Sequence, residues 1–136
     1  TYSGHPVACA VALKNLEIIE REGLIERVRD DTGPYFAEQL AQRVAPHAIV
    51  GETRSAGLMG AIEIVRDKQT RERFPGGGVA AVCIRDHAIA NGLMLRAVGD
   101  TMILSPPLIW TRETIDLAID RILTALDLLT DAAREN

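Results

Sequence analysis

The stretch GLMLRAVGDTMILSPPLI, residues 92–109, predicts two short strands joined by a tight turn. Leu93–Ala97 and Thr101–Leu104 supply the apolar strand residues, and Val98-Gly99-Asp100 between them supplies the turn. Pro106 and Pro107 end the second strand, because proline has no N–H to donate to a sheet. This segment therefore predicts a hairpin near the end of the chain.

Upstream of this hairpin, a second pair of strands is expected at Ile49–Thr53 and Leu58–Val65. Arg54–Gly57 between them predicts a turn or a bulge, and Gly60 weakens the second strand. Arg66–Gly78 is polar and ends in a proline and three glycines, so it predicts a surface loop.

Helices account for most of the remaining sequence, and each has a recognisable start or stop. Ser3 is the expected N-cap of the first helix, and Thr111 is the expected N-cap of the last. Gly33-Pro34 predicts a kink or short break in the second helix. The expected helices are 7–22, 24–44, 79–90 and 112–134. The resulting order of elements predicts an α+β domain with a small, mainly antiparallel sheet covered by helices on one face.

The first helix has almost no polar side over Val7–Leu13. A helix that is apolar all round needs burial on several sides, and a domain of this size can hardly provide it alone. We therefore expect a larger partner surface for this helix. The sequence also has no initiator methionine and opens inside a turn-to-helix signal, which is typical of a fragment, although N-terminal processing is the simpler alternative.

Composition narrows the class of protein. The 136 residues are 47% apolar and 25% charged, the profile of a globular domain with its own core. A net charge of -4 argues against nucleic acid as the main partner, and no apolar run approaches the roughly 20 residues that cross a bilayer. Cys9 and Cys83 are expected to be reduced thiols in a cytoplasmic protein.

Common catalytic and metal motifs are missing from the sequence. The glycines at 76–78 lack the strand and the Lys-Ser/Thr of a phosphate loop, and His5, His47 and His87 have no zinc spacing, so no metal site is expected. Lys14 lies within a helix and Lys68 in a charged stretch. Neither lysine is predicted to form a Schiff base, which requires a sheltered site.

Two segments remain as candidate ligand sites. Thr1–Pro6 places hydroxyls and free N–H groups at a helix start, which suits an anion, although simple capping explains the same pattern. Arg96 at a strand end can hold a carboxylate through two hydrogen bonds, and an ion pair with Asp100 or Glu63 is the alternative. For Arg54 a structural ion pair is the favoured interpretation.

These segments together resemble the class III, pyridoxal-phosphate (PLP) dependent aminotransferases. TYSGHPVACAVAL at 1–13 is similar to the helix start that follows the lysine region in that family, most closely in its ω-amino acid:pyruvate transaminase group. RSAGLMGAIE at 54–63 and the hairpin at 92–109 also resemble the family, in the same order and with similar separations.

The resemblance implies that residues 1–136 are the C-terminal small domain of a fold-type I aminotransferase, with 1–22 leading in from an absent large PLP-binding domain. Thr1 would reach the PLP phosphate of the neighbouring subunit in a homodimer, and Arg96 would pair with the substrate carboxylate. His5 is expected to be structural. The full protein would move an amino group from an amine or ω-amino acid to an α-keto acid such as pyruvate.

The Schiff-base lysine of the family would lie upstream of position 1, so the chain alone is expected to be inactive and contributes no catalytic residue. The alternative is a non-catalytic α+β module whose apolar first helix binds another protein.

Overall fold

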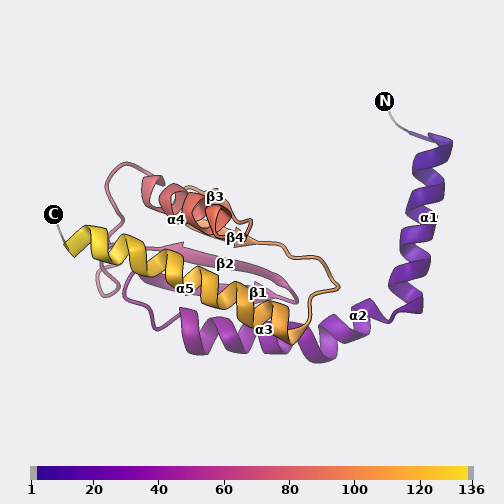
Figure 1. The fold of residues 1–136 in the computed structure, drawn as a ribbon, viewed down its shortest axis with the longest axis horizontal. Coiled ribbons are helices and arrows are strands. Elements are labelled where there is room, and N and C mark those ends of the chain that lie inside the picture. Colours follow the sequence, from indigo (N-terminus) through magenta and orange to yellow (C-terminus); the bar gives the residue numbers. More distant parts are fainter. Residues whose placement is uncertain (1–2, 135–136) are drawn as a thin grey trace.

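A computed structural model describes residues 3–134 of the chain and the side chains of residues 3–130. Thr1 therefore lies outside the described residues. The elements, in chain order, are α1 (Pro6–Arg21), α2 (Leu24–Arg27), the π-helical segment η1 (Val28–Thr32), α3 (Gly33–Gln39), the π-helical segment η2 (Leu40–Val44), β1 (Val50–Ala56), β2 (Met59–Ile64), α4 (Val79–Ala90), β3 (Arg96–Val98), β4 (Thr101–Leu104) and α5 (Arg112–Arg134) (Figure 1).

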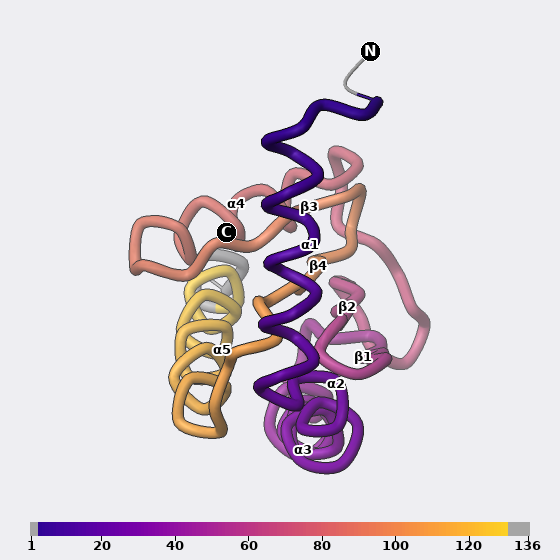
Figure 2. The backbone as a smooth tube through the Cα atoms, turned by 90° about the vertical axis from the view of Figure 1, so that its right-hand side faces the viewer, coloured from indigo at the N-terminus to yellow at the C-terminus, as the bar shows by residue number. Residues whose placement is uncertain are grey.

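The strands form one antiparallel sheet in the order β1-β2-β4-β3. The two predicted hairpins therefore lie side by side, and β2 and β4 are the central strands. Helices α3, α4 and α5 pack on one face of this sheet, and no helix of residues 3–134 covers the other face (Figure 2). The expected α+β fold with a small antiparallel sheet is confirmed.

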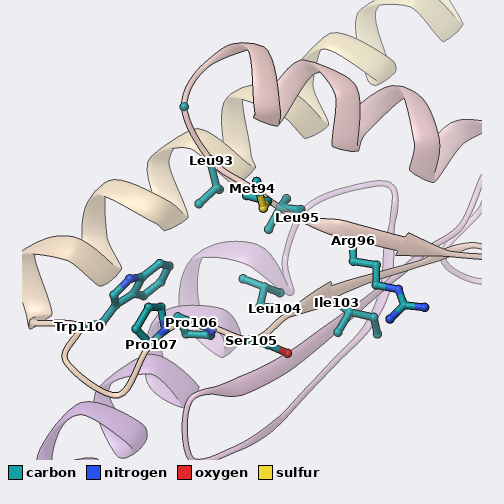
Figure 3. A pocket seen from close by; sticks show the side chains of 11 residues that line it. Leu93, Met94, Leu95, Arg96, Ile103, Leu104, Ser105, Pro106, Pro107 and Trp110 are labelled. Atoms are coloured by element: carbon teal, nitrogen blue, oxygen red, sulfur yellow. The ribbon is translucent and has the colours of Figure 1, made fainter. Parts of the chain in front are cut away.

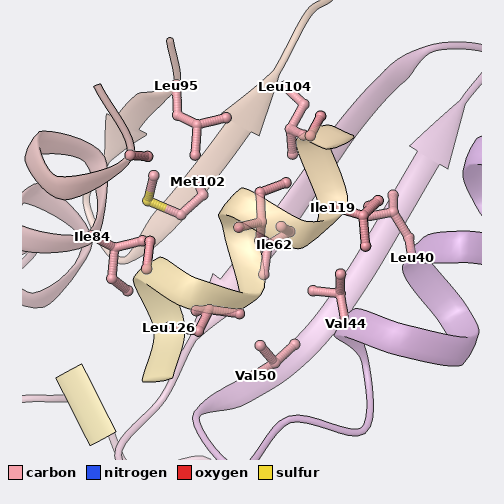
Figure 4. Packing of buried hydrophobic residues seen from close by; sticks show 14 of the residues in the cluster. Leu40, Val44, Val50, Ile62, Ile84, Leu95, Met102, Leu104, Ile119 and Leu126 are labelled. Carbon is pink, nitrogen blue, oxygen red and sulfur yellow. The ribbon is translucent and has the colours of Figure 1, made fainter. Parts of the chain in front are cut away.

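A single hydrophobic core lies between the sheet and the three helices (Figure 4). Ile62 and Ile64 of β2 and Met102 of β4 are at most 1% exposed, because alternate residues of a strand point to the same face. Helix α5 contributes a buried apolar stripe made of Ile115, Ile119, Ile122 and Leu126. Burial of this kind is the main stabilising contribution to a domain of this size, at roughly 25 cal/mol per Å² of apolar surface.

The second helix differs from the expected broken one. Residues 24–44 stay helical throughout and include two π-helical segments, and the first of these ends where Gly33 begins α3. The N–H of Gly33 donates to the carbonyl of Val28, one residue farther back than in an α-helix. A Cβ on Gly33 would lie 2.3 Å from that oxygen. The wider turn thus absorbs the Gly33-Pro34 pair without breaking the helix.

Three sequence-based boundaries were wrong by more than one residue. The N-cap of α1 is His5, not Ser3, because Gly4 turns the chain with φ 74° and Pro6 opens the helix. Arg54–Ala56 belong to β1, not to a turn, since Ala56 pairs with Met59 and only two residues connect the strands. The pairing of β3 begins at Arg96 rather than Leu93, because its partner β4 ends at Leu104 ahead of the prolines.

Helix α1 extends away from the rest of the molecule, and its main contacts are with α2 (Figure 1). None of its residues is buried, and Val7, Val11, Leu13 and Leu16 are each more than 60% exposed. The helix forms as predicted, but no residue among those that the structure describes buries its apolar side chains. No helix among residues 3–134 has the length and apolar character needed to span a bilayer.

Candidate substrate-binding site

The β3–β4 hairpin positions Arg96 on the open face of the sheet. Arg96 pairs with Ile103, Ile103 with Ala61, and Ala61 with Arg54, so these side chains form one row across the four strands. Directly paired residues of a sheet point to the same side. Because Ile62 and Met102 of the neighbouring row face the core, Arg54 and Arg96 both point away from the helices, at opposite edges.

The segment before β3 is shaped by the end of α4. Gly92 has φ 79° and follows the helix end, and the N–H of Leu93 donates to the carbonyl of Ala88 at 2.8 Å. This arrangement is typical of a glycine-terminated helix. It directs Leu93 and Leu95 into the core, where they are 7% and 6% exposed, and leaves Met94 87% exposed.

A pocket of about 600 Å³ opens between this segment and the chain that leaves β4. Trp110 and the two prolines lie at one end, and the guanidinium of Arg96 lies at the other (Figure 3). Leu93, Leu104 and Ile103 give the pocket apolar walls, and the Ser105 side chain also lines it. An apolar pocket with a few polar groups is the usual form of a small-molecule site.

Arg96 has no ion-pair partner among residues 3–130. The two acids that the sequence offered as partners are bound elsewhere. Asp100 is buried, accepts a hydrogen bond from the N–H of Gly78 at 2.9 Å and lies 3.6 Å from Arg73. Glu63 accepts from Arg71 at 2.6 Å. The guanidinium of Arg96 is therefore exposed and free to bind an anion.

The other arginines of this sheet face are neutralised. Arg54 pairs with Glu52 at 3.2 Å, as the sequence favoured, and Arg71 reaches both Glu52 and Glu63. The hydrogen bond from Arg71, followed by that from Arg54, holds the pKa of the Glu52 carboxyl below its ordinary value. Of the three arginines on this face, Arg96 alone keeps an uncompensated charge within the described residues.

The described residues do not form a PLP site by themselves. Lys14 is exposed on α1 and pairs with Glu17 at 2.8 Å. Lys68 is also exposed, and its ammonium donates to the carbonyl of Ala45. A Schiff-base lysine needs a sheltered, low-dielectric position, which neither lysine has. His5 is exposed and makes no side-chain cap to α1.

Comparison with known proteins assigns the family. The class-III aminotransferase profile matches residues 1–126, which is most of the chain. The chain belongs to the class III aminotransferases. Enzymes of this family depend on PLP.

Two curated relatives illustrate the range of this aminotransferase family. The chain is 50% identical over 127 residues to putrescine–pyruvate aminotransferase of Pseudomonas aeruginosa, covering 93% of this chain and 27% of that protein. It is 38% identical over 134 residues to diaminobutyrate–2-oxoglutarate transaminase of Halomonas elongata, covering 97% of this chain and 28% of that protein. The chain thus spans little more than a quarter of the length of these relatives.

Solved aminotransferases share the fold of this class III chain. A thermostable ω-transaminase mutant from Pseudomonas jessenii superposes with a TM-score of 0.88 at 37% identity, over 94% of this chain and 28% of that one. The PMP-bound form of an aminotransferase from Vibrio fluvialis gives a TM-score of 0.87, with the same identity and coverage.

The sequence identified Arg96 but not the pocket beside it. Trp110 and Ser105 line that pocket from beyond β4, and their position depends on how the chain turns after Pro107. Within the sequence, the signal that could have indicated this pocket was the proline pair, because it marks where the strand must leave the sheet.

Proposed function

We propose that this chain is the C-terminal small domain of a PLP-dependent aminotransferase that transfers an amino group from an amine or ω-amino acid to an α-keto acid such as pyruvate. The observation that carries the proposal is the free guanidinium of Arg96 at the mouth of an apolar pocket. A guanidinium can bind both oxygens of a carboxylate at once, which suits a keto acid or an ω-amino acid. Family membership supports the reaction class.

The chemistry would be divided between this domain and the rest of the protein. PLP supplies the electron sink for amino-group transfer, and its Schiff-base lysine would come from a large domain outside these residues. Arg96 would bind and orient the substrate carboxylate, and the apolar pocket walls would exclude water around it. Thr1 would contribute to the phosphate site of a neighbouring subunit in a homodimer located in the cytoplasm.

Helix α1 would connect this domain to the large one. None of its residues is buried here, and its exposed apolar side chains would be covered by the large domain. The same bare helix is what a non-catalytic interaction module would offer to another protein. The family match and the free Arg96 favour the enzyme, because an interaction module has no need of a carboxylate site.

The proposal is tested by replacing Arg96 in the full-length enzyme. R96A should weaken the reaction with pyruvate by about 2–4 kcal/mol, since a charged hydrogen-bonded contact is lost. An amine that lacks a carboxylate should be affected much less. The measurement is kcat/KM for each substrate, and equal losses for both would contradict the assignment.

The matched control is R54A. Arg54 lies on the same row of the same sheet face, but its charge is already paired with Glu52. Its replacement should leave the ratio of the two kcat/KM values unchanged. A selective loss with pyruvate in R54A as well would indicate a general effect of charge on this face and would remove the special role of Arg96.

A further inference from the structure

A buried carboxylate fastens the turn of the hairpin that carries Arg96. Only 8% of the Asp100 side chain is exposed. Its Oδ1 accepts the N–H of Gly78 at 2.9 Å, and its Oδ2 lies 3.6 Å from the Arg73 guanidinium. The main-chain carbonyl of Asp100 accepts the N–H of Ile64 at 2.8 Å. One residue therefore links the turn to the start of α4, to β2 and to the 66–78 loop.

The contact between the turn and α4 is also close in the backbone. Gly78 has φ 86°, and a Cβ placed on it would lie 2.9 Å from the carbonyl oxygen of Gly99. The carboxylate of Asp100 thus sits at the N-terminus of α4, where the helix dipole favours a negative charge. The cap residue of α4 is Gly78, which has no side chain that could bond to this helix start. The close backbone approach of Gly78 and Gly99 and the charge of Asp100 therefore hold the turn against the helix.

This anchor bears on Arg96 because β3 is short and lies at the edge of the sheet. The strand has three residues, lies at the sheet edge and pairs only with β4. Arg96 is two residues before Val98, which pairs with Thr101 directly across the turn. A strand rises about 3.3 Å per residue, so Arg96 lies close to the turn. A displacement of the turn would therefore also displace Arg96.

We propose that Asp100 is a positioning residue for substrate binding: it fixes the β3–β4 turn on α4 so that Arg96 is held in place for the substrate carboxylate. The proposal rests on the proposed role of Arg96. A purely structural Asp100 would instead support the fold and affect all substrates alike.

The test uses D100A and D100N in the full-length enzyme. D100A removes the acceptor for Gly78 and should raise KM for pyruvate by about tenfold or more, because displacements near 1 Å in a site cost up to about 100-fold. KM and kcat for an amine without a carboxylate should stay within about twofold. D100N keeps an oxygen that can accept from Gly78 and should restore most of the pyruvate affinity.

Two further variants separate the possible outcomes. R73Q removes the ion-pair partner of Asp100, an arginine whose side chain is 70% exposed. It should leave KM unchanged both for pyruvate and for the amine without a carboxylate. G78A keeps the carboxylate but forces the turn away from α4, so it should reproduce the selective effect of D100A. It also provides the test if D100A fails to fold.

The result that overturns the proposal is an equal loss for both substrates in D100A and G78A. A wild-type KM for pyruvate in folded D100A or in G78A would overturn it as well. R96A measured in the same assay distinguishes a failure of the proposed role of Arg96 from a failure of the positioning role of Asp100. If R96A shows no selectivity, the role of Arg96 fails. If R96A is selective and the turn variants are not, only the positioning role of Asp100 fails.

Discussion

At the scale of single residues, pairing decides which arginine of the open sheet face can bind a ligand. Arg54 and Arg71 share the carboxylates of Glu52 and Glu63, whereas Arg96 shares none within the described residues. The sequence favoured an ion pair for Arg54 but left Asp100 and Glu63 open as partners of Arg96. The cross-strand register distinguishes these arginines, because it places Glu52 beside Glu63 and leaves Arg96 at the far edge.

The ion pairs of Glu52 should make stability depend on pH. The pKa of Glu52 is lowered from its ordinary value of 4.5, so its stabilising contribution is complete above that value and is lost as pH falls through the lower pKa of the folded state. E52Q should therefore be less stable than wild type at pH 7, and the difference should shrink toward pH 3. Urea unfolding midpoints at both pH values measure this.

The control for this pH effect is E20Q. Glu20 lies on α1 and makes no ion pair with any residue from 3 to 130. Its replacement should leave the difference from wild type the same at both pH values. A constant difference in E52Q as well would show that the carboxylate contributes nothing through its charge.

At the scale of elements, α5 shows how local signals and packing combine. The hydroxyl of Thr111 accepts the N–H of Thr114 at 3.3 Å, and its carbonyl accepts the N–H of Ile115 at 3.0 Å. The helix then buries a stripe of apolar residues against α3, α4 and the sheet. Asp116 of this helix accepts a hydrogen bond from the hydroxyl of Tyr35 in α3 at 2.7 Å. The start of α5 was predictable because capping is local.

Loss of that cap should have a measurable cost. T111A should lower the free energy of unfolding by about 1 kcal/mol, the usual value for an N-cap threonine. T124A is the matched control, because Thr124 is within the same helix and its hydroxyl donates only to the carbonyl of Asp120. Alanine is the better helix former at such a position, so T124A should be neutral or slightly stabilising. Equal destabilisation of both variants would argue against a capping role.

At the scale of the whole molecule, one well-packed unit carries a helix that it does not bury. The side chains of the hydrophobic core, which come mainly from α3, α4, α5 and the sheet, are buried. Helix α1 extends away from this core, and its Val7, Val11 and Leu16 are exposed. The proposed large domain would supply the missing contacts. The stability contribution of α1 should therefore differ between this chain and the full-length protein.

Two substitutions measure this difference. V11A should change the unfolding free energy of the isolated chain by less than about 0.5 kcal/mol, as for other surface sites. I62A should cost about 2–5 kcal/mol in the same chain, because Ile62 is fully buried. In the full-length protein, V11A should cost clearly more than in the chain. The same small effect in both would contradict burial of α1 by a large domain.

The sequence alone was sufficient for most element positions. Helix α4 was predicted at its exact bounds, and Arg96 was identified as a candidate carboxylate ligand from its place at a strand end. The N-cap at Ser3 was wrong because Gly4 turns the chain and Pro6 opens the helix. The wrong boundaries at Arg54 and Leu93 both lie where hydrogen-bond pairing with another segment sets the end of a strand. Such pairing cannot be read from one segment by itself.

Periodicity, capping residues and proline punctuation determined the α+β fold, because these signals act within a few residues of each other. The tertiary structure decided the rest: the side-by-side arrangement of the two hairpins, the pocket between Trp110 and Arg96, and the partners of Asp100 and Glu63. Those features join residues that are far apart in the chain. They depend on which groups folding brings within hydrogen-bond distance, and that is a property of the packed molecule.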